Sequence, residues 1–163
     1  KVPSASLNDI ELIHSMKNTD IPIILSTGMS TQEEVDSAIN LLEENDLAVL
    51  HCVSTYPTPP EELNLNVIKT YKKKYPNLII GYSGHETGLS TTYAAVALGA
   101  KIIERHITLD RSMWGTDHSA SVEPQGLKSL VSNVRDIESA MGTGVKEVTK
   151  GEIPIREKLR RVQ

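Results

Sequence analysis

The stretch LIIGYSGHETGLSTTYAAVALGAKIIERHI, residues 78–107, decides the fold of this chain. It opens with a short apolar run at 78–81, continues as a helical pattern from about Gly88, and returns to an apolar run at 101–103 that extends to 107. Gly99 stands where a glycine commonly ends a helix. A strand, a helix and a second strand in this order predict two parallel strands joined by a right-handed crossover.

The same alternation continues on both sides of this unit. Two further apolar runs, at 21–25 and 47–52, have the short β-branched character of parallel strands that are buried on both faces. Helical spacing of apolar residues predicts a helix at 31–45, started by a capping box of Ser30 and Glu33, and another from Pro124 to Met141, ended by Gly142. Weaker helical patterns cover 8–17 and 63–75.

Two architectures have this alternation: an open doubly wound sheet and a (β/α)8 TIM barrel. The open sheet usually has a glycine-rich phosphate loop after its first strand, and neither GxGxxG nor GxxxxGK[ST] is present. Each predicted strand instead ends in polar residues, as in barrels, which place their chemistry at the carboxyl ends of several strands. A complete barrel takes about 250 residues. We therefore expect a little more than half of a barrel, with a further strand at 1–6.

Composition excludes several function classes. The chain has 163 residues with a formal net charge of −4, which disfavours a nucleic acid partner because phosphate backbones require a basic face. No apolar run approaches the roughly 20 residues that span a bilayer, so we expect no membrane association. The single cysteine, Cys52, rules out an internal disulfide and fits a reducing, cytoplasmic location.

Three residues at the ends of the last two predicted strands suggest a metal site. His85 and His106 follow consecutive strands, so both imidazoles can reach one cation, although on spacing alone two structural histidines held by hydrogen bonds are the more ordinary interpretation. Glu104 precedes His106 by two residues and therefore faces the same side of the strand. A buried carboxylate needs a partner, so Glu104 either belongs to the site or pairs with Arg105, Lys101 or Lys1.

Hydroxyl groups and two loops complete the candidate site. Serine and threonine side chains follow three of the predicted strands and suit a phosphate or carboxylate ligand, although helix caps use the same residues. Cys52 has no evident base other than His51, which points the opposite way, and is expected to be a small core residue. The proline-rich loop after 52 presets Tyr56 over the mouth of the barrel. The loop at 110–123 places Asp117 against sugar hydroxyls and Trp114 against a sugar face, or it is a solvent-exposed turn.

Six strings in the same order make the chain resemble the sialic acid synthase family, whose members condense phosphoenolpyruvate with N-acetylmannosamine or a related aldose. The strings are KVPS (1–4), ILSTGM (24–29), HCVSTYPTP (51–59), IGYSGH (80–85), IERHITLD (103–110) and GTDHSASVEP (115–124). Family members are TIM barrels. The resemblance implies that this chain covers strands four to eight.

The resemblance also implies roles for individual residues. His85 and His106 match the family's ligands to Mn²⁺ or a similar divalent ion such as Mg²⁺ or Co²⁺, and with Glu104 they form the implied catalytic set. The implied substrate-binding residues fall into two groups: those for phosphoenolpyruvate are Lys1, Ser4, Ser26, Ser54 and Ser83, and those for the amino sugar are Tyr56 and Asp117. Two departures from the family pattern, Ser6 in place of a Glu and Gly84 in place of an Asp, bear on the acceptor.

The implied partners are phosphoenolpyruvate, an N-acyl amino sugar and, in the full-length form, a second copy of the protein. The implied activity is that of a carbon–carbon bond-forming transferase that needs the earlier barrel strands, so we expect 1–163 alone to be inactive. We also expect the N-terminal strands and a C-terminal antifreeze-like domain to lie outside it. The alternatives are a synthase of legionaminic, pseudaminic or deaminated acids, a metal-dependent class II aldolase, or a non-catalytic fragment with an interaction role.

Overall fold

The computed structural model describes residues 1–162 and contains one parallel sheet. Its four strands lie in the order in which they occur in the sequence, β1-β2-β3-β4. Their bounds are Ile23–Ser26, Leu47–Cys52, Ile79–Gly84 and Ile103–Arg105. Doubly wound sheets reverse their strand order at a switch point, whereas barrel strands follow one another around the axis. The sequential order therefore matches an arc of a barrel.

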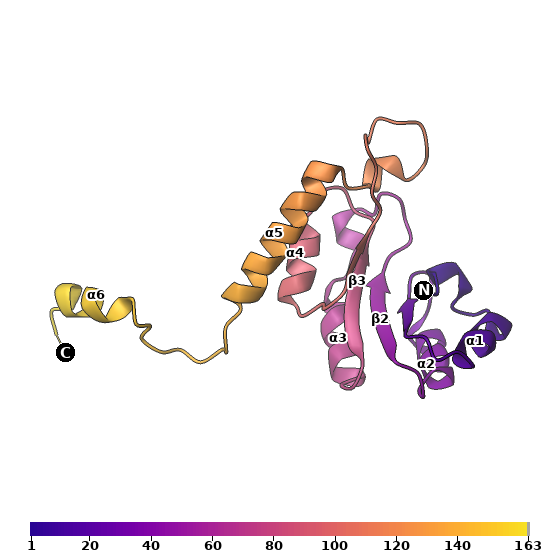
Figure 1. Cartoon of the computed structure of the whole chain (residues 1–163), viewed down its shortest axis with the longest axis horizontal. Coiled ribbons are helices and arrows are strands. Elements are labelled where there is room, and N and C mark those ends of the chain that lie inside the picture. The colour runs from indigo at the N-terminus through magenta and orange to yellow at the C-terminus, as the bar shows by residue number, and fades with distance from the viewer. Residues whose placement is uncertain (163) are drawn as a thin grey trace.

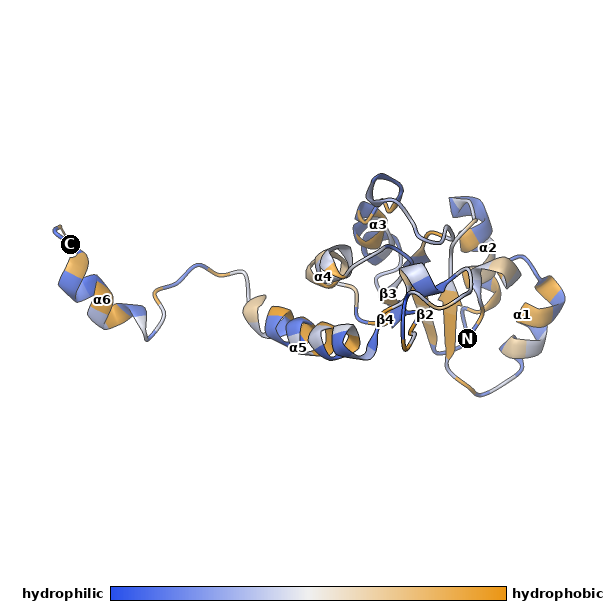
Figure 2. Ribbon diagram, turned by 90° about the horizontal axis from the view of Figure 1, so that it is seen from above, coloured by the Kyte–Doolittle hydropathy of each residue, from blue (hydrophilic) through white to orange (hydrophobic). Residues whose placement is uncertain are grey.

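Helices follow the strands and lie outside this arc. In Figure 2, α1, α2, α3, α4 and α5 succeed one another around the strands, and Figure 1 shows α3, α4 and α5 together beside β3. Among residues 1–162, no helix lies on the inner side of the arc, as the barrel interpretation requires. The bounds of the five are Ile10–Lys17, Gln32–Leu41, Asn66–Lys74, Ser90–Ala97 and Pro124–Ala140.

The two faces of the sheet differ in chemistry because side chains alternate along each strand. One face carries apolar side chains that pack under the helices and form the main core, among them Leu25, Val49 and Ile80. The opposite face carries polar side chains near the strand ends: Ser26, Cys52, Ser83 and Glu104. The strand register thus gathers polar groups at the carboxyl end of the inner face.

The strand predicted at 47–52 has the bounds of β2, and the apolar run at 78–81 overlaps the first half of β3, but other boundaries differ. The helix expected at 31–45 ends at Leu41, and the one expected at 63–75 runs from Asn66 to Lys74, after a 3-10 turn at Pro60–Glu62. The capping box at α2 was assigned wrongly: Thr31, not Ser30, accepts from the backbone N–H of Glu34, whose carboxylate accepts from the Thr31 N–H. The Ser30 hydroxyl instead donates to the Gly28 carbonyl.

The two ends of the chain also differ from expectation. The strand expected at 1–6 is reduced to one parallel bridge, between Val2 and Leu25, and Ser4–Ser6 form a 3-10 turn. At the other end, α6 (Glu152–Leu159) projects away from the rest of the chain on an extended segment (Figure 1). Among residues 1–162, no helix combines the length and apolarity needed to cross a bilayer.

Candidate functional site

Cys52, Ser83 and Glu104 form a row across the ends of β2, β3 and β4. Cys52 is the register partner of Ser83, and Ser83 is the register partner of Glu104. Register partners on parallel strands point to the same side of a sheet, which explains why the Ser83 hydroxyl donates to Glu104 Oε1 at 2.8 Å. Sequence alone placed these residues at strand ends, and the register brings them together.

Lys1, far from Glu104 in the sequence, contacts the same carboxylate. Its Nζ lies 2.9 Å from Glu104 Oε1, so of the three partners considered for this carboxylate the structure selects Lys1. Burial raises the pKa of Glu104, but the hydrogen bonds from Lys1 and Ser83 outweigh burial and leave this pKa below its ordinary value. Glu104 therefore carries a negative charge. Its carboxylate holds Lys1 and Ser83, two of the residues expected to bind phosphoenolpyruvate, close to each other.

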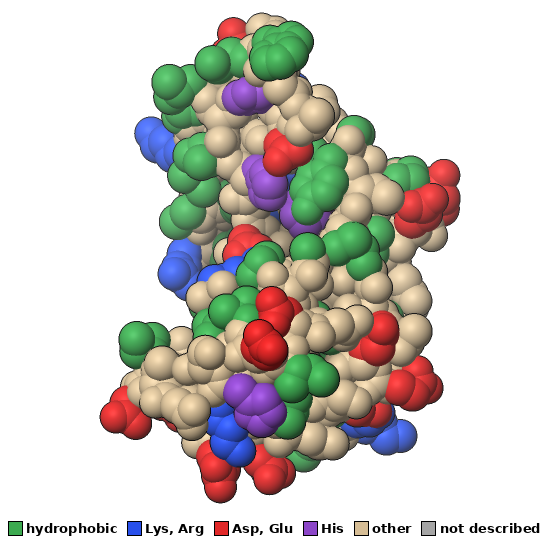
Figure 3. Space-filling model, turned by 90° about the vertical axis from the view of Figure 1, so that its right-hand side faces the viewer, with side chains coloured by type: hydrophobic (Ala, Val, Ile, Leu, Met, Phe, Trp, Pro, Cys, Tyr) green, Lys and Arg blue, Asp and Glu red, His purple; other side chains and the backbone are tan. Residues whose placement is uncertain are grey.

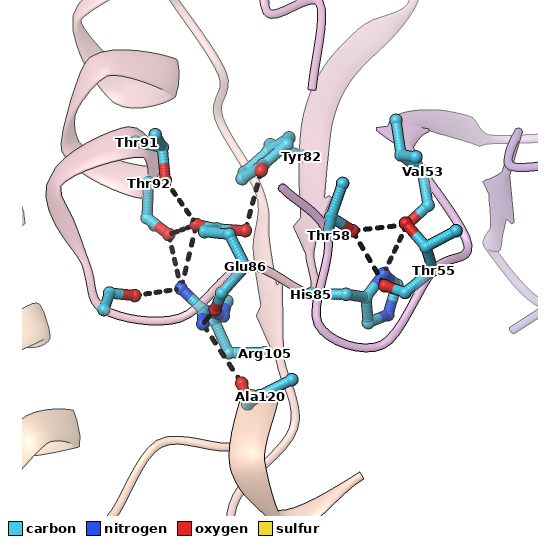
Figure 4. Close-up of polar contacts among 11 residues, drawn as sticks. Val53, Thr55, Thr58, Tyr82, His85, Glu86, Thr91, Thr92, Arg105 and Ala120 are labelled. Carbon is cyan, nitrogen blue, oxygen red and sulfur yellow. Dashed lines mark hydrogen bonds and ion pairs between the residues drawn. The ribbon is translucent and has the colours of Figure 1, made fainter. Parts of the chain in front are cut away.

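His85 is fixed from both its backbone and its side chain. It is buried, its carbonyl accepts from the Thr58 N–H at 3.0 Å, and its Nδ1 lies 2.8 Å from the Val53 carbonyl (Figure 4). Because a carbonyl only accepts, Nδ1 must carry the hydrogen, and in the neutral ring Nε2 then has a free lone pair. This arrangement, with one ring nitrogen bound to a carbonyl, is usual for a metal-binding histidine.

His106, Tyr56 and Asp117 lie beside His85. The ring centroids of His85 and His106 are 5.1 Å apart, and the Tyr56 ring lies 4.4 Å from the first and 5.6 Å from the second. Asp117 Oδ2 lies 3.5 Å from His106 Nδ1. Burial, followed by the nearby negative charges, raises the pKa of Tyr56. Figure 3 shows histidine, hydrophobic and acidic side chains gathered on the corresponding face.

The Cys52 thiol is part of this cluster, because the ring of His85 lies near it in addition to the neighbouring His51. Its sulfur lies 3.8 Å from His85 Nδ1, 3.5 Å from Ser4 Oγ and 3.7 Å from Ser54 Oγ. Burial raises the pKa of Cys52, but these contacts outweigh burial and lower it. For His85 burial acts in the opposite direction and lowers the pKa. The contacts with Cys52 and the Val53 carbonyl outweigh burial and raise this pKa above its ordinary value. The residue is nevertheless buried, as predicted.

Gly28 explains how the hydroxyl groups approach so closely. A Cβ at this position would lie 2.2 Å from Ser54 Oγ and 2.9 Å from Ser4 Oγ, so a larger side chain would displace both. The Gly28 N–H donates to Ser4 Oγ at 2.9 Å. Gly28 was not identified as a site residue from the sequence, although its position directly after a predicted strand was the available signal.

Ser26 is the exception among the hydroxyl groups. Its side chain is 1% exposed, and within residues 1–162 its Oγ has no hydrogen-bond partner. A buried hydroxyl without a partner costs free energy. The Ser26 hydroxyl on the inner face of the sheet is therefore free to form a hydrogen bond with a ligand.

The donor set fits a divalent cation held by two imidazoles. His85 offers a lone pair on Nε2, and His106 lies beside it with about a third of its side chain exposed. Across the described part of the chain, no three His, Cys, Asp or Glu side chains come together as a ready metal cage. A cation here would keep its remaining positions for water and substrate, the arrangement of catalytic rather than structural sites.

The loop at 110–123 divides into a part near the site and a part away from it. Asp117 belongs to the first part, whereas Trp114 is fully exposed and contacts no ring of the site. His118 is held within the loop, where its Nδ1 lies 2.7 Å from the Thr108 hydroxyl. The loop is therefore positioned by internal hydrogen bonds, with one carboxylate directed at His106.

Comparison with known proteins identifies the family. A family model described as the NeuB family matches residues 1–146. The chain belongs to the NeuB family. The resemblance to sialic acid synthases is thereby confirmed, and the sheet of this NeuB-family chain is half of a parallel barrel-type sheet.

Several of the similar proteins are synthases of sialic and related acids. The chain is 44% identical to human N-acetylneuraminate-9-phosphate synthase, covering 98% of this chain and 45% of that protein. It is 41% identical to the N,N'-diacetyllegionaminic acid synthase of Campylobacter jejuni, covering 93% of this chain and 47% of that protein. The chain thus spans about half the length of these relatives.

A solved structure extends the likeness to three dimensions. The sialic acid synthetase of Leptospira borgpetersenii serovar Hardjo-bovis, in complex with citrate, superimposes with a TM-score of 0.86 at 36% identity. The match covers 98% of this chain and 57% of that one. The roles expected for the individual site residues stay predictions, because they rest on the family motifs and on the geometry described above.

Proposed function

We propose that this chain is the later part of the barrel of a synthase that condenses phosphoenolpyruvate with N-acetylmannosamine or a related N-acyl amino sugar. The products are a nonulosonic acid and inorganic phosphate. The observation that supports this most is the convergence of two kinds of group at one end of the sheet. Lys1, Ser83 and Glu104 form a hydrogen-bonded anion-binding unit, and the rings of His85 and His106 lie next to it.

The anionic donor fits the hydroxyl and ammonium groups of the inner face. Lys1 supplies a positive charge, and Ser26 and Ser83 supply hydroxyl donors for phosphate or carboxylate oxygens. Ser4 and Ser54, held around Gly28, extend this donor surface along the ends of β1 and β2. Their contribution is to bind and orient the donor rather than to form a covalent bond with it.

The acceptor fits the groups on the other side of the histidines. Tyr56 offers an aromatic face, and Asp117 offers a carboxylate for sugar hydroxyls. Glu104 is placed between the two halves and can accept a proton from a water that adds to the donor carbon. The enol carbon of phosphoenolpyruvate first forms a bond to the aldehyde carbon, whose oxygen takes up a proton and becomes a hydroxyl. Water then adds to the carbon that bears the phosphate, Glu104 accepts its proton, and the bond from that carbon to the phosphate oxygen breaks as phosphate leaves.

A divalent cation such as Mn²⁺, Mg²⁺ or Co²⁺ held by His85 and His106 would act as a Lewis acid that polarises the aldehyde oxygen. For this role His85 must present Nε2, and the Val53 carbonyl holds the ring in that tautomer. His106 is oriented through the carboxylate of Asp117.

Three wider features belong to the same proposal. The four-stranded arc is completed by earlier strands to a (β/α)8 barrel, in which these elements are among strands four to eight. The complete protein acts as a homodimer in the cytoplasm. A related acid such as legionaminic acid is the second candidate product, because a legionaminic acid synthase is among the similar proteins.

The test is turnover of the complete protein that contains this chain, with phosphoenolpyruvate and a panel of aldoses, measured as phosphate release. We expect activity with an N-acyl amino sugar, and loss of metal-dependent turnover in His85→Ala without loss of the fold. His14→Ala, on the exposed surface of α1, is the control and should keep activity. Near-normal turnover of His85→Ala with added Mn²⁺ would place the cation elsewhere, and no turnover with any aldose would refute the proposed reaction.

A further inference from the structure

Directly behind the two histidines lies a buried ion pair that the proposed reaction does not use. Glu86 follows His85 and Arg105 precedes His106, and their side chains are 2% and 3% exposed. Arg105 Nη1 lies 3.0 Å from Glu86 Oε1 (Figure 4). The sequence offered Arg105 as a partner for Glu104, and this was wrong because the two alternate along β4 and point to opposite faces.

Glu86 is fully satisfied by its surroundings. Its Oε1 accepts from the hydroxyls of Thr91 and Thr92 at 2.8 Å each, and its Oε2 accepts from the Tyr82 hydroxyl at 2.9 Å. Burial raises the pKa of Glu86, but Arg105 and these donors outweigh burial and lower it. The carboxylate therefore ties β3 to the start of α4 and holds the guanidinium in one place.

Arg105 directs its Nη1 and Nη2 groups at three separate segments, while its buried Nε has no hydrogen-bond partner among residues 1–162. It donates to the carbonyls of Glu86 at 2.6 Å and Gly88 at 2.9 Å, to the Thr92 hydroxyl at 2.7 Å, and to the carbonyl of Ala120 at 3.3 Å. The first three contacts belong to the turn after His85 and to α4. The contact with Ala120 reaches the loop that carries Asp117.

The loop contact is the informative one. The loop is closed at its ends by a bridge between Ile107 and Val122, and the Val122 N–H donates to the His106 carbonyl at 2.7 Å. Ala120 in turn donates its N–H to the Asp117 carbonyl at 3.2 Å. A planar guanidinium fixes the direction of each acceptor that it binds, so one side chain relates the turn after His85, the backbone at His106 and the Asp117 loop.

We propose that Arg105, held by Glu86, is a positioning residue that sets the distance between His85 and His106 and places Asp117 over His106. The metal and the acceptor in this inference come from the proposed function. The hydrogen bonds of Arg105 that support it are independent of that function. A buried ion pair adds little net stability compared with an apolar pair of the same volume, whereas its hydrogen bonds fix direction. The pair therefore serves the alignment of the site more than the stability of the fold.

The test compares Arg105→Lys with Thr91→Val in the complete protein. Arg105→Lys keeps the charge but loses the planar set of donors, so it cannot serve the turn, α4 and Ala120 together. Thr91→Val removes a different hydrogen bond to the same Glu86 oxygen and leaves the contact with Ala120 intact. Thermal unfolding checks that each variant folds. Each variant is then measured for Mn²⁺ affinity by titration without substrate, for amide hydrogen exchange in residues 107–122, and for the KM of each substrate.

We expect Arg105→Lys to weaken Mn²⁺ binding by about 10- to 100-fold, as when a residue that orients metal ligands is changed. Exchange of the amides at 117–122 should quicken by about tenfold, the loss of one net hydrogen bond. The KM for the amino sugar should rise, whereas the KM for phosphoenolpyruvate should not. Thr91→Val should leave these four quantities within about twofold, because the hydrogen bond that it removes does not involve the loop.

Equal effects of the two variants, or unchanged ion affinity and exchange in Arg105→Lys, would overturn the proposal and leave a structural ion pair. If Arg105→Lys does not fold, the uncharged pair Glu86→Gln with Arg105→Gln decides: restored folding with lost ion affinity supports positioning, and restored affinity overturns it. If the wild-type protein binds no Mn²⁺, the metal part of the proposed function fails. Exchange in the Asp117 loop still gives the answer on positioning.

Discussion

At the scale of single residues, some polar side chains of the site already have hydrogen-bond partners within the protein, and one has none. Glu104 holds Lys1 and Ser83, and its Oε1 must yield at least one of them when an anion binds to these donors. Ser26 is the opposite case, because its buried hydroxyl has no partner among residues 1–162. The site therefore combines preformed contacts with an unused donor, and the two kinds of residue should respond differently to substitution.

Ser26→Ala should weaken phosphoenolpyruvate binding without weakening the fold. A hydrogen bond to a charged ligand contributes about 1.5–3 kcal/mol, which predicts a rise in KM for phosphoenolpyruvate of about 10- to 150-fold. Because a buried hydroxyl without a partner costs free energy, its removal should not lower the free energy of unfolding. Steady-state kinetics and urea unfolding measure the two effects. A loss of stability with normal KM would mean that Ser26 is a structural residue.

At the scale of elements, the inner and outer faces of the sheet explain what sequence reasoning found and what it missed. The strand at 47–52 was predicted because it is apolar apart from His51, and the ends of β3 and β4 were identified because polar residues follow apolar runs. The contact between Cys52 and His85 was missed because it depends on the register of β2 against β3 and on the path of the loop after Cys52, which no local pattern contains. The pairing of Arg105 with Glu86 was missed for the same reason.

The capping of α2 gives a test at this scale. Thr31→Ala should cost about 1 kcal/mol of stability, the usual effect of removing an N-cap side chain, because it frees the Glu34 N–H and breaks the capping box. Ser30→Ala is the matched control, one residue earlier, and should cost less than about 0.5 kcal/mol. Urea unfolding of both variants measures the difference. A larger loss for Ser30→Ala would restore the assignment made from sequence.

At the scale of the whole molecule, the described sheet has two outer strands. β1 is followed on its free side only by the bridge from Val2 to Leu25, and no further strand pairs with β4 within residues 1–162. A closed barrel has no such edges, because every strand has two neighbours. Together with the span of about half of its relatives, the open arc explains why sequence patterns predicted the individual elements better than the closure of the fold.

The open edges predict that the 163-residue chain associates when it is produced by itself. Unpaired backbone groups on outer strands are templates for pairing with another chain, and α6 adds exposed apolar side chains in Ile153, Ile155 and Leu159. Size-exclusion chromatography with light scattering should therefore give a mass that rises with protein concentration. A chain that ends after Gly142 separates the two causes: association that persists without α6 comes from the sheet edges, and association that disappears comes from α6. A monomer of constant mass that unfolds cooperatively would contradict the prediction, because it would mean that residues 1–162 cover their own strand edges in solution.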